Sequence, residues 1–224
     1  ILAFGNPEIA YNSYPPLMAS ETEVNEIGYT YKLAKVLTGK GASESYFKKN
    51  ASSYDILHLA CHTRINTEQE LFSSLLMSPG ENDDGDLNIY ELYKMDINAY
   101  LVVLSACESG IGKVTLGDDI TSLSRSFIYA GTPSVICSLW NVEDESTAYL
   151  MKEFYKQLKI YDKSVSLRKA QLLTKRKYKH IKFWIQTMTL HYWHLMNMIL
   201  ISDEKYVNYI YYFILALTHE DCNL

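Results

Sequence analysis

The amino-acid sequence predicts an α/β fold with a mostly parallel β-sheet and helices on both of its faces. Short apolar runs alternate along the chain with segments of helical periodicity, which is the pattern of successive βαβ units. The run Leu101–Leu104 is apolar throughout, as is typical of a strand buried on both faces of a parallel sheet. The chain has 224 residues, 48% of them hydrophobic, and this is enough for one sizeable core.

The expected strands are short apolar or β-branched runs that end at turn residues. They cover Ile1–Phe4, Ile56–Ala60, Leu75–Ser78, Leu101–Leu104 and Ser134–Leu139. The expected helices carry apolar residues at helical spacing. After a first helix they cover Ala42–Lys49, Ile89–Met95, Asp119–Ala130, Glu143–Leu158 and Ser164–Thr174. A capping-box pattern from Ser20 to Glu23 predicts where the first helix begins, and Gly39 predicts where it ends.

The C-terminal part has a different pattern. After Lys179 the chain is rich in Trp, Tyr, Met and Ile but shows no clear period. We therefore expect a domain over residues 1–180, followed by an atypical tail, 181–224, whose structure the pattern does not define. The chain starts on an expected strand without an initiator Met, so we expect it to be part of a longer protein.

Composition and charge argue against several classes of partner. The net charge is −5 and no extended basic run occurs, so we expect no nucleic-acid partner. The apolar run Tyr206–Leu217 is shorter than the ~20 residues of a membrane span, so we expect no membrane contact. His191 and His194 have no acidic or cysteine partner nearby, and we expect no metal or other cofactor. Four cysteines without a C-x-x-C pair, and no signal-peptide pattern, favour a cytoplasmic location.

Two of the expected strands lead to side chains that can carry chemistry. The first leads to His62 and the second to Cys107. Because the carboxyl ends of parallel strands meet at one edge of a sheet, we expect the two segments to lie side by side, with the imidazole near the thiol. His62 can then activate the thiolate and protonate a leaving amine. Backbone N–H groups beside both residues can hold the oxyanion of an acyl transfer.

The residues alone leave a structural alternative open, because cysteine and histidine are also common inside protein cores. Cys61 and Cys137 lie within apolar strands, and we expect both to pack in the core. His58 lies on the strand before His62. We expect it to be a buried, hydrogen-bonded histidine that supports the site.

Several separate motifs occur in an order that resembles a known family. They are Ala3-Phe4-Gly5-Asn6-Pro7, His58-Leu59-Ala60-Cys61-His62, Leu104-Ser105-Ala106-Cys107-Glu108-Ser109-Gly110, the stretch from Leu123 to Gly131, and Ser138-Leu139-Trp140-Asn141-Val142-Glu143-Asp144. Together they resemble the CHAT domain, a caspase-like cysteine peptidase module usually attached to tetratricopeptide (TPR) repeats. The resemblance covers roughly residues 1 to 180 and implies a caspase-like fold.

The resemblance also implies an activity and roles for residues. By it, the chain is a cysteine endopeptidase of the caspase, separase and gingipain clan, with Cys107 as nucleophile and His62 as general acid and base. The backbone N–H groups of Thr63 and Cys107 hold the oxyanion. Glu143 or Asp144 selects a basic residue before the cut bond, since an acid can pair with Arg through bidentate contacts. The alternative for these two acids is that they cap the following helix.

The implied partners are a protein or peptide substrate and a TPR region or another regulatory partner. Two departures from the family motivate a second hypothesis, a catalytically inactive interaction module that keeps the fold. Thr63 stands where the family usually has glycine, and the family's final strand pattern is lost after Trp184. A third hypothesis is a small-molecule hydrolase with the same Cys–His pair, which would have a deep closed pocket instead of an open groove.

Overall fold

The computed structural model describes residues 1–66, 68–105, 118–138, 144–178 and 187–191. For residues 118–122, 138, 144 and 187–191 it describes the backbone. The chain divides into two compact units, Ile1–Leu190 and His191–Leu224. All the elements below belong to the first unit, apart from the last residue of the last strand.

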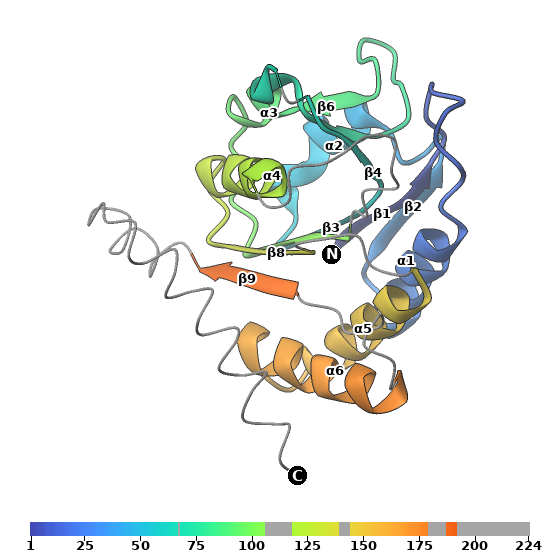
Figure 1. Ribbon diagram of the computed structural model, residues 1–224, viewed down its shortest axis with the longest axis vertical. Helices are drawn as coiled ribbons and strands as arrows, with labels where there is room; N and C mark the ends of the chain where they lie inside the picture. Colours follow the sequence, from blue (N-terminus) through green and yellow to red (C-terminus); the bar gives the residue numbers. More distant parts are fainter. Residues whose placement is uncertain (67, 106–117, 139–143, 179–186, 192–224) are drawn as a thin grey trace, which may run out of the picture. The chain divides into compact units, whose positions relative to one another are not determined.

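A six-stranded sheet forms the centre of the first unit, with the strand order β2-β1-β3-β7-β8-β9 (Figure 1). These strands are β1 (Leu2–Pro7), β2 (Lys35–Gly39), β3 (Ile56–Ala60), β7 (Leu101–Leu104), β8 (Ser134–Ser138) and β9 (Thr187–His191). The neighbouring strands from β2 to β8 all pair in parallel. The mostly parallel sheet that the sequence predicts is therefore confirmed.

Helices cover both faces of this sheet (Figure 1). One face carries α1 (Met18–Thr30), α5 (Asp144–Gln157) and α6 (Lys163–Lys177); the other carries α2 (Glu44–Asn50), α3 (Ile89–Leu92) and α4 (Asp118–Tyr129), with the short 3-10 helices η1 (Ala51–Ser53) and η2 (Glu70–Phe72) on the same side. The two-residue alternation of β7 explains the two layers. Leu101 and Val103 are buried with the α1, α5 and α6 side chains, whereas Val102 and Leu104 are buried with those of α2 and α4.

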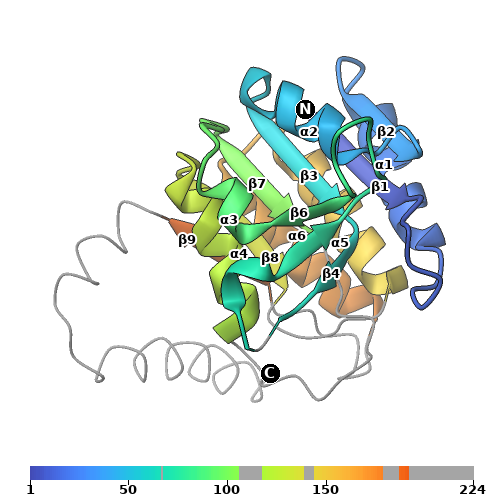
Figure 2. The same cartoon turned by 90° about the horizontal axis from the view of Figure 1, so that it is seen from above.

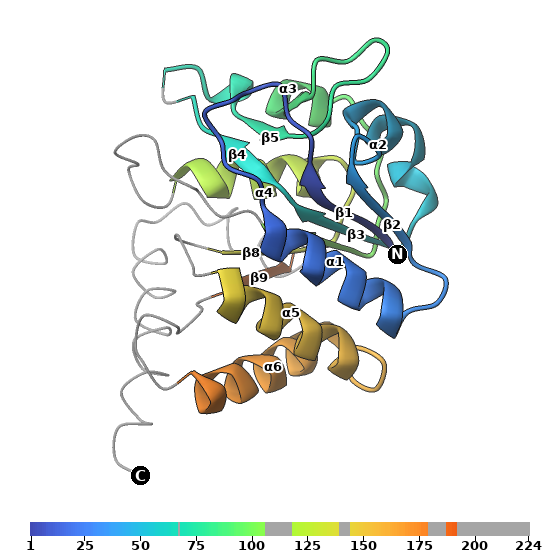
Figure 3. The same cartoon turned by 90° about the vertical axis from the view of Figure 1, so that its right-hand side faces the viewer.

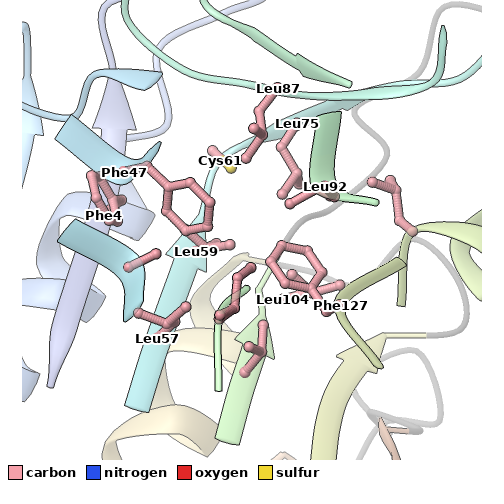
Figure 4. Packing of buried hydrophobic residues seen from close by; sticks show 14 of the residues in the cluster. Phe4, Phe47, Leu57, Leu59, Cys61, Leu75, Leu87, Leu92, Leu104 and Phe127 are labelled. Atoms are coloured by element: carbon pink, nitrogen blue, oxygen red, sulfur yellow. The ribbon is translucent and has the colours of Figure 1, made fainter. Parts of the chain in front are cut away.

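A second, antiparallel sheet of three short strands follows the end of β3 (Figure 2). Its strands, in spatial order, are β4 (His62–Arg64), β5 (Ser74–Leu76) and β6 (Asp86–Asn88). Residues directly opposite each other share a face, so His62, Leu76 and Asp86 form one row. Leu75 and Leu87, on the other face, are fully buried in the core with side chains of α2 and α4 (Figure 4). One face of this small sheet therefore closes the core, and the opposite face carries His62.

The first helix differs from its prediction at both ends. It begins at Met18, and the N-cap residue Leu17 makes no side-chain capping bond, so the predicted capping box at Ser20 is wrong. Ser20 instead accepts a hydrogen bond from the Asn6 backbone N–H at 2.9 Å. The predicted continuation to Gly39 is also wrong, because Lys35–Gly39 is the edge strand β2. Its apolar spacing suits a helix or a strand, and the parallel pairing with β1 decides between them.

The other predicted elements are found within a few residues of their expected bounds. The helix end predicted at Gly131 is confirmed: α4 ends at Tyr129 and Gly131 has a φ of +101°. A Cβ atom there would also lie 2.9 Å from Asn98 Oδ1, so both the backbone and the space require glycine. The strands β4, β6 and β9 were not predicted. None of the helices in the described ranges is both long enough and apolar enough to cross a membrane.

Candidate functional site

The two segments with candidate catalytic residues are neighbours in the sheet. β3 and β7 pair in parallel, with Leu59 opposite Leu104. The pairing continues beyond β7, because the Ser105 backbone N–H donates to the Leu59 carbonyl oxygen at 3.0 Å. The predicted adjacency of the two segments is therefore confirmed. Cys107 follows Ser105 by two positions in the sequence and lies outside the described residues.

His62 lies just beyond the carboxyl end of β3, at the first residue of β4, and is only 3% exposed. Its Nε2 atom is 2.8 Å from the backbone carbonyl oxygen of Pro15. Because a carbonyl oxygen only accepts, Nε2 carries the proton in this contact. A neutral His62 in this hydrogen bond has its lone pair on Nδ1.

The connection between β1 and α1, residues 8–17, provides this carbonyl and passes beside β4 (Figure 3). Within it, the ring of Tyr14 lies 5.0 Å from the His62 ring, centroid to centroid, with an interplanar angle of 50°. Asn6 fixes the base of the connection. It has a φ of 44°, in the left-handed region that Asn tolerates better than most residues, and its Oδ1 accepts the Leu17 backbone N–H at 2.8 Å.

A hydrogen-bonded group of Tyr11, Arg64 and Asp86 holds the far end of the same connection. Tyr11 Oη donates to Asp86 Oδ2 at 2.6 Å. Arg64 donates to both partners, from Nη1 to Tyr11 Oη at 2.5 Å and from Nη2 to Asp86 Oδ2 at 2.6 Å. The hydrogen bond to Asp86, with burial, raises the pKa of Tyr11. This group is not predicted from the sequence, although the alternation of β4 puts Arg64 on the same face as His62.

Thr63 has an ordinary strand conformation. It pairs with Leu75, whose side chain is in the core, and its own Oγ1 is buried without a hydrogen-bond partner. Among the described residues other than glycine, only Asn6 and Asn98 have a positive φ. The backbone at Thr63 therefore does not need the conformational freedom of glycine. Its side chain lies on the core side of β4, opposite to the face of His62.

His58 is fully buried on β3 and contacts side chains from two helices. Its Nδ1 lies 3.1 Å from Tyr155 Oη on α5, and its Nε2 lies 2.8 Å from Glu23 Oε1 on α1. The Glu23 contact has the length of an ion pair, but its direction is not that of a well-aligned hydrogen bond. The expectation that His58 is buried and hydrogen-bonded is confirmed. Its support of the site remains a prediction.

Two of the cysteines are core residues, as predicted. Cys61 is fully buried beside Leu59 and Leu75 (Figure 4), and burial raises the pKa of its thiol to about 12. Burial also raises the pKa of Cys137 to about 11, against the opposite effect of a hydrogen bond with Ser124. Neither thiol therefore forms a thiolate readily near neutral pH.

The two acids expected to select the substrate, Glu143 and Asp144, are adjacent in the sequence. Glu143 lies outside the described residues, and Asp144 is the first residue of α5, with its side chain outside the description. A carboxylate is favourable at a helix N-terminus, so the helix-capping alternative also stays open. Within the described ranges, no group of three or more His, Cys, Asp or Glu side chains could hold a metal ion.

The chain matches one family model, described as the CHAT domain, over residues 1–198. No curated protein matches it significantly. The matched range contains β1 to β9, and therefore the whole six-stranded sheet with both of the strands that lead to His62 and Cys107.

Solved structures of cysteine proteinases share the fold. The Arg-specific cysteine proteinase gingipain R has a TM-score of 0.51 and 9% identity, over 82% of this chain and 43% of that chain. A complex of the pro- and mature domains of RgpB from Porphyromonas gingivalis has a TM-score of 0.53 and 12% sequence identity, over 82% of this chain and 44% of that chain. Another similar structure is that of protein GSU0716 from Geobacter sulfurreducens, with a TM-score of 0.50 and 15% sequence identity, over 84% of this chain and 91% of that chain. The chain thus spans less than half of the gingipain chains, and likeness at these identities shows the shared fold alone.

Proposed function

This chain belongs to the CHAT domain family, and from this membership we propose that it is a cysteine endopeptidase that cleaves a protein or peptide substrate. Cys107 is the proposed nucleophile and His62 the proposed general acid and base. The observation that best supports this proposal is the setting of His62. His62 lies just beyond the carboxyl end of β3, the strand that pairs with β7, and its Nε2 is hydrogen-bonded to the Pro15 carbonyl, which supports proton transfer through Nδ1.

The proposed reaction has two steps. In the first, the Cys107 thiolate attacks the carbonyl carbon of the scissile peptide bond, the C–N bond breaks, and protonated His62 gives its Nδ1 proton to the leaving amine. The acyl part of the substrate is then held on Cys107 as a thioester. In the second step, water gives a proton to His62 Nδ1 and attacks the thioester. This releases the carboxylic acid and restores the Cys107 sulfur.

The tetrahedral intermediates of both steps carry a negative oxygen that needs N–H donors. We assign this role to the backbone N–H groups of Thr63 and Cys107. The position of Thr63 in β4, next to His62, supports the assignment, and its core-directed side chain leaves the face of His62 clear. This supports a proposed site in which the Thr63 side chain does not hinder catalysis.

Specificity for a basic residue before the cut bond is the proposed role of Glu143 or Asp144. The similar gingipain is Arg-specific, and an acid beside the cleavage site would pair with Arg or Lys. Paired peptides that differ only in Arg or Gln at this position test the assignment. The Arg peptide is expected to have the higher kcat/KM, and Glu143→Gln or Asp144→Asn is expected to reduce that preference.

The test of the activity itself is a peptide-library cleavage assay on the full-length protein, so that attached repeats or a regulatory partner can act. Wild type is compared with Cys107→Ala, and Cys222→Ala serves as the control that removes a different thiol. We expect cleavage by wild type and by Cys222→Ala but not by Cys107→Ala. A peptide with an electrophilic carbonyl is expected to label Cys107 covalently, which mass spectrometry of the digested protein detects.

Two outcomes would count against the proposal. If wild type and Cys107→Ala give the same products, Cys107 is not the nucleophile. If wild type gives no product with any library, alone or with its partners, the chain is better described as a catalytically inactive interaction module that keeps the CHAT fold.

A further inference from the structure

We propose that Tyr11, held by Arg64 and Asp86, is a positioning residue for His62. This inference rests on the proposed function, because it concerns the residue that carries the general acid and base. Tyr11 does not contact His62 through a hydrogen bond of its own. It acts through the connection 8–17, which presents the Pro15 carbonyl oxygen to His62 Nε2 at 2.8 Å.

Side-chain hydrogen bonds hold the connection at two places, in addition to the ring contact of Tyr14 with His62. At its base, Asn6 Oδ1 accepts the Leu17 backbone N–H at 2.8 Å, which joins the end of β1 to the start of α1. At its far end, the Tyr11 hydroxyl donates to Asp86 at 2.6 Å. Pro15 lies between these two points in the sequence. Loss of the Tyr11 attachment would leave the Pro15 carbonyl with the Asn6–Leu17 hydrogen bond on one side and only the ring contact of Tyr14 with His62 on the other.

The attachment point belongs to the same rigid element as His62. Asp86 lies in the row of His62 in the second sheet, and Arg64 is two residues further along β4 on the same face. Asp86 is almost fully buried, and its Oδ2 accepts both the Tyr11 hydroxyl and the Arg64 guanidinium. Hydrogen bonds to a charged group are stronger than neutral ones. The small sheet thus carries both His62 and the anchor that places the acceptor for its ring.

This acceptor favours the tautomer of His62 that carries its proton on Nε2. With Nε2 donating to Pro15, the neutral ring keeps its lone pair on Nδ1, which is the nitrogen that the proposed mechanism uses. Without a fixed carbonyl, the neutral ring can exchange between its two tautomers and rotate. This lowers the fraction of molecules ready for proton transfer and leaves the binding of the substrate unchanged.

The test is Tyr11→Phe in the full-length protein, because phenylalanine keeps the ring and removes only the hydroxyl. Tyr29→Phe is the matched control, since Tyr29 lies on α1 and is 81% exposed. We expect kcat to fall about tenfold in Tyr11→Phe, with little change in KM. This loss is smaller than the ~10²–10⁴-fold rate increase that general acid–base catalysis contributes, because His62 itself is still present. Arg64→Lys keeps the charge but cannot bridge two partners in the same way, and a smaller loss of kcat is expected.

A second measurement does not depend on activity. ¹⁵N NMR of histidine-labelled protein identifies the protonated ring nitrogen, and comparison with His62→Gln assigns the His62 signals. Wild type and Tyr29→Phe are expected to show the proton of the neutral ring on Nε2, and Tyr11→Phe a mixture of tautomers. A thermal melt of each variant separates this local effect from a loss of fold.

The outcomes distinguish the two proposals. If wild type cleaves in a Cys107-dependent manner but Tyr11→Phe keeps the wild-type kcat and tautomer, the positioning role is overturned and the peptidase stands. If wild type does not cleave, the peptidase fails. The NMR comparison then decides alone whether Tyr11 orients His62. An equal fall of kcat in Tyr29→Phe would also overturn the positioning role.

Discussion

Glu23 Oε1 lies 2.8 Å from His58 Nε2 in the core between α1 and β3, and both side chains are almost fully buried. In Glu23→Ala the imidazole loses this partner and remains buried, so we expect the free energy of unfolding to fall by about 1–3 kcal/mol. Urea denaturation followed by circular dichroism measures the loss. Glu23→Gln, which keeps a polar group beside the buried imidazole, is expected to lose less.

The control for Glu23 is another acid on α1. Glu26 contacts Lys152 at 3.0 Å, but both of these side chains are 35% exposed. Exposed ion pairs contribute up to about 1 kcal/mol, so Glu26→Ala is expected to cost no more than that. Equal losses in Glu23→Ala and Glu26→Ala would show that burial does not set the strength of the Glu23–His58 contact.

The lowered pKa of Asp83 predicts how the stability of the fold changes in acid. Hydrogen bonds from Lys48, at 2.7 Å, and from Ser45 lower the pKa of Asp83 below its ordinary value of 3.8. The folded state then binds a proton on Asp83 less readily than the unfolded chain. The stabilisation is present above that ordinary value and is lost as pH falls through the folded-state pKa. Asp83→Asn is therefore expected to be less stable than wild type at pH 7 by up to about 1 kcal/mol.

Urea titrations at pH 7, 5 and 2 test this pH dependence. The difference between wild type and Asp83→Asn is expected to stay constant from pH 7 to 5 and to shrink towards pH 2. A difference that grows as the pH falls would have the wrong sign and would contradict the assignment.

Because the thiols of Cys61 and Cys137 are buried, we expect them to be alkylated only after the protein unfolds. Cys61 has its pKa raised to about 12 and Cys137 to about 11, so at pH 7.5 almost none of either thiol is ionised. In folded protein we expect iodoacetamide to leave both unmodified. In urea both are expected to react. Mass spectrometry of peptides at each stage measures the result, and rapid labelling of Cys61 in folded protein would contradict it.

Thr63→Gly tests whether the threonine impairs the site. Thr63 has ordinary strand geometry and a core-directed side chain, so we expect no rise in kcat. Glycine in a strand is expected to lower the free energy of unfolding by about 1 kcal/mol. Cleavage kinetics measure kcat, and urea denaturation measures the free energy of unfolding. A large increase in kcat would show instead that the threonine restricts the oxyanion site.

The central strands were predictable from local pattern because each is a short apolar run bounded by turn residues. β3 and β7 have the bounds that the sequence predicts, Ile56–Ala60 and Leu101–Leu104. The sequence predicts the residues of β2 as the end of a helix, because their apolar spacing fits either period and only the pairing with β1 distinguishes a strand from a helix. Strands of three residues, such as β4 and β6, are too short for any period to be visible.

The site was predictable only in part, for a similar reason. His62 could be predicted as a candidate because it follows a recognisable strand, and the rule for parallel sheets gathers such residues at one edge. The anchor of Tyr11 joins residues 75 positions apart in the sequence, and the bond between Arg64 and Asp86 spans 22. A single sequence contains no sign of these contacts, which depend on how the second sheet folds against the β1–α1 connection.

The order of the strands in the main sheet has a consequence for how the protein is made. From β1 onwards the order β1-β3-β7-β8-β9 follows the chain, and only β2 is added on the other side. Each newly synthesised strand of the main sheet can therefore dock on a free edge of the strands already paired, without being inserted between two of them. Such a sheet can grow on the ribosome from its N-terminal end, and a nascent chain that stops after β8 already contains the strands that flank β7.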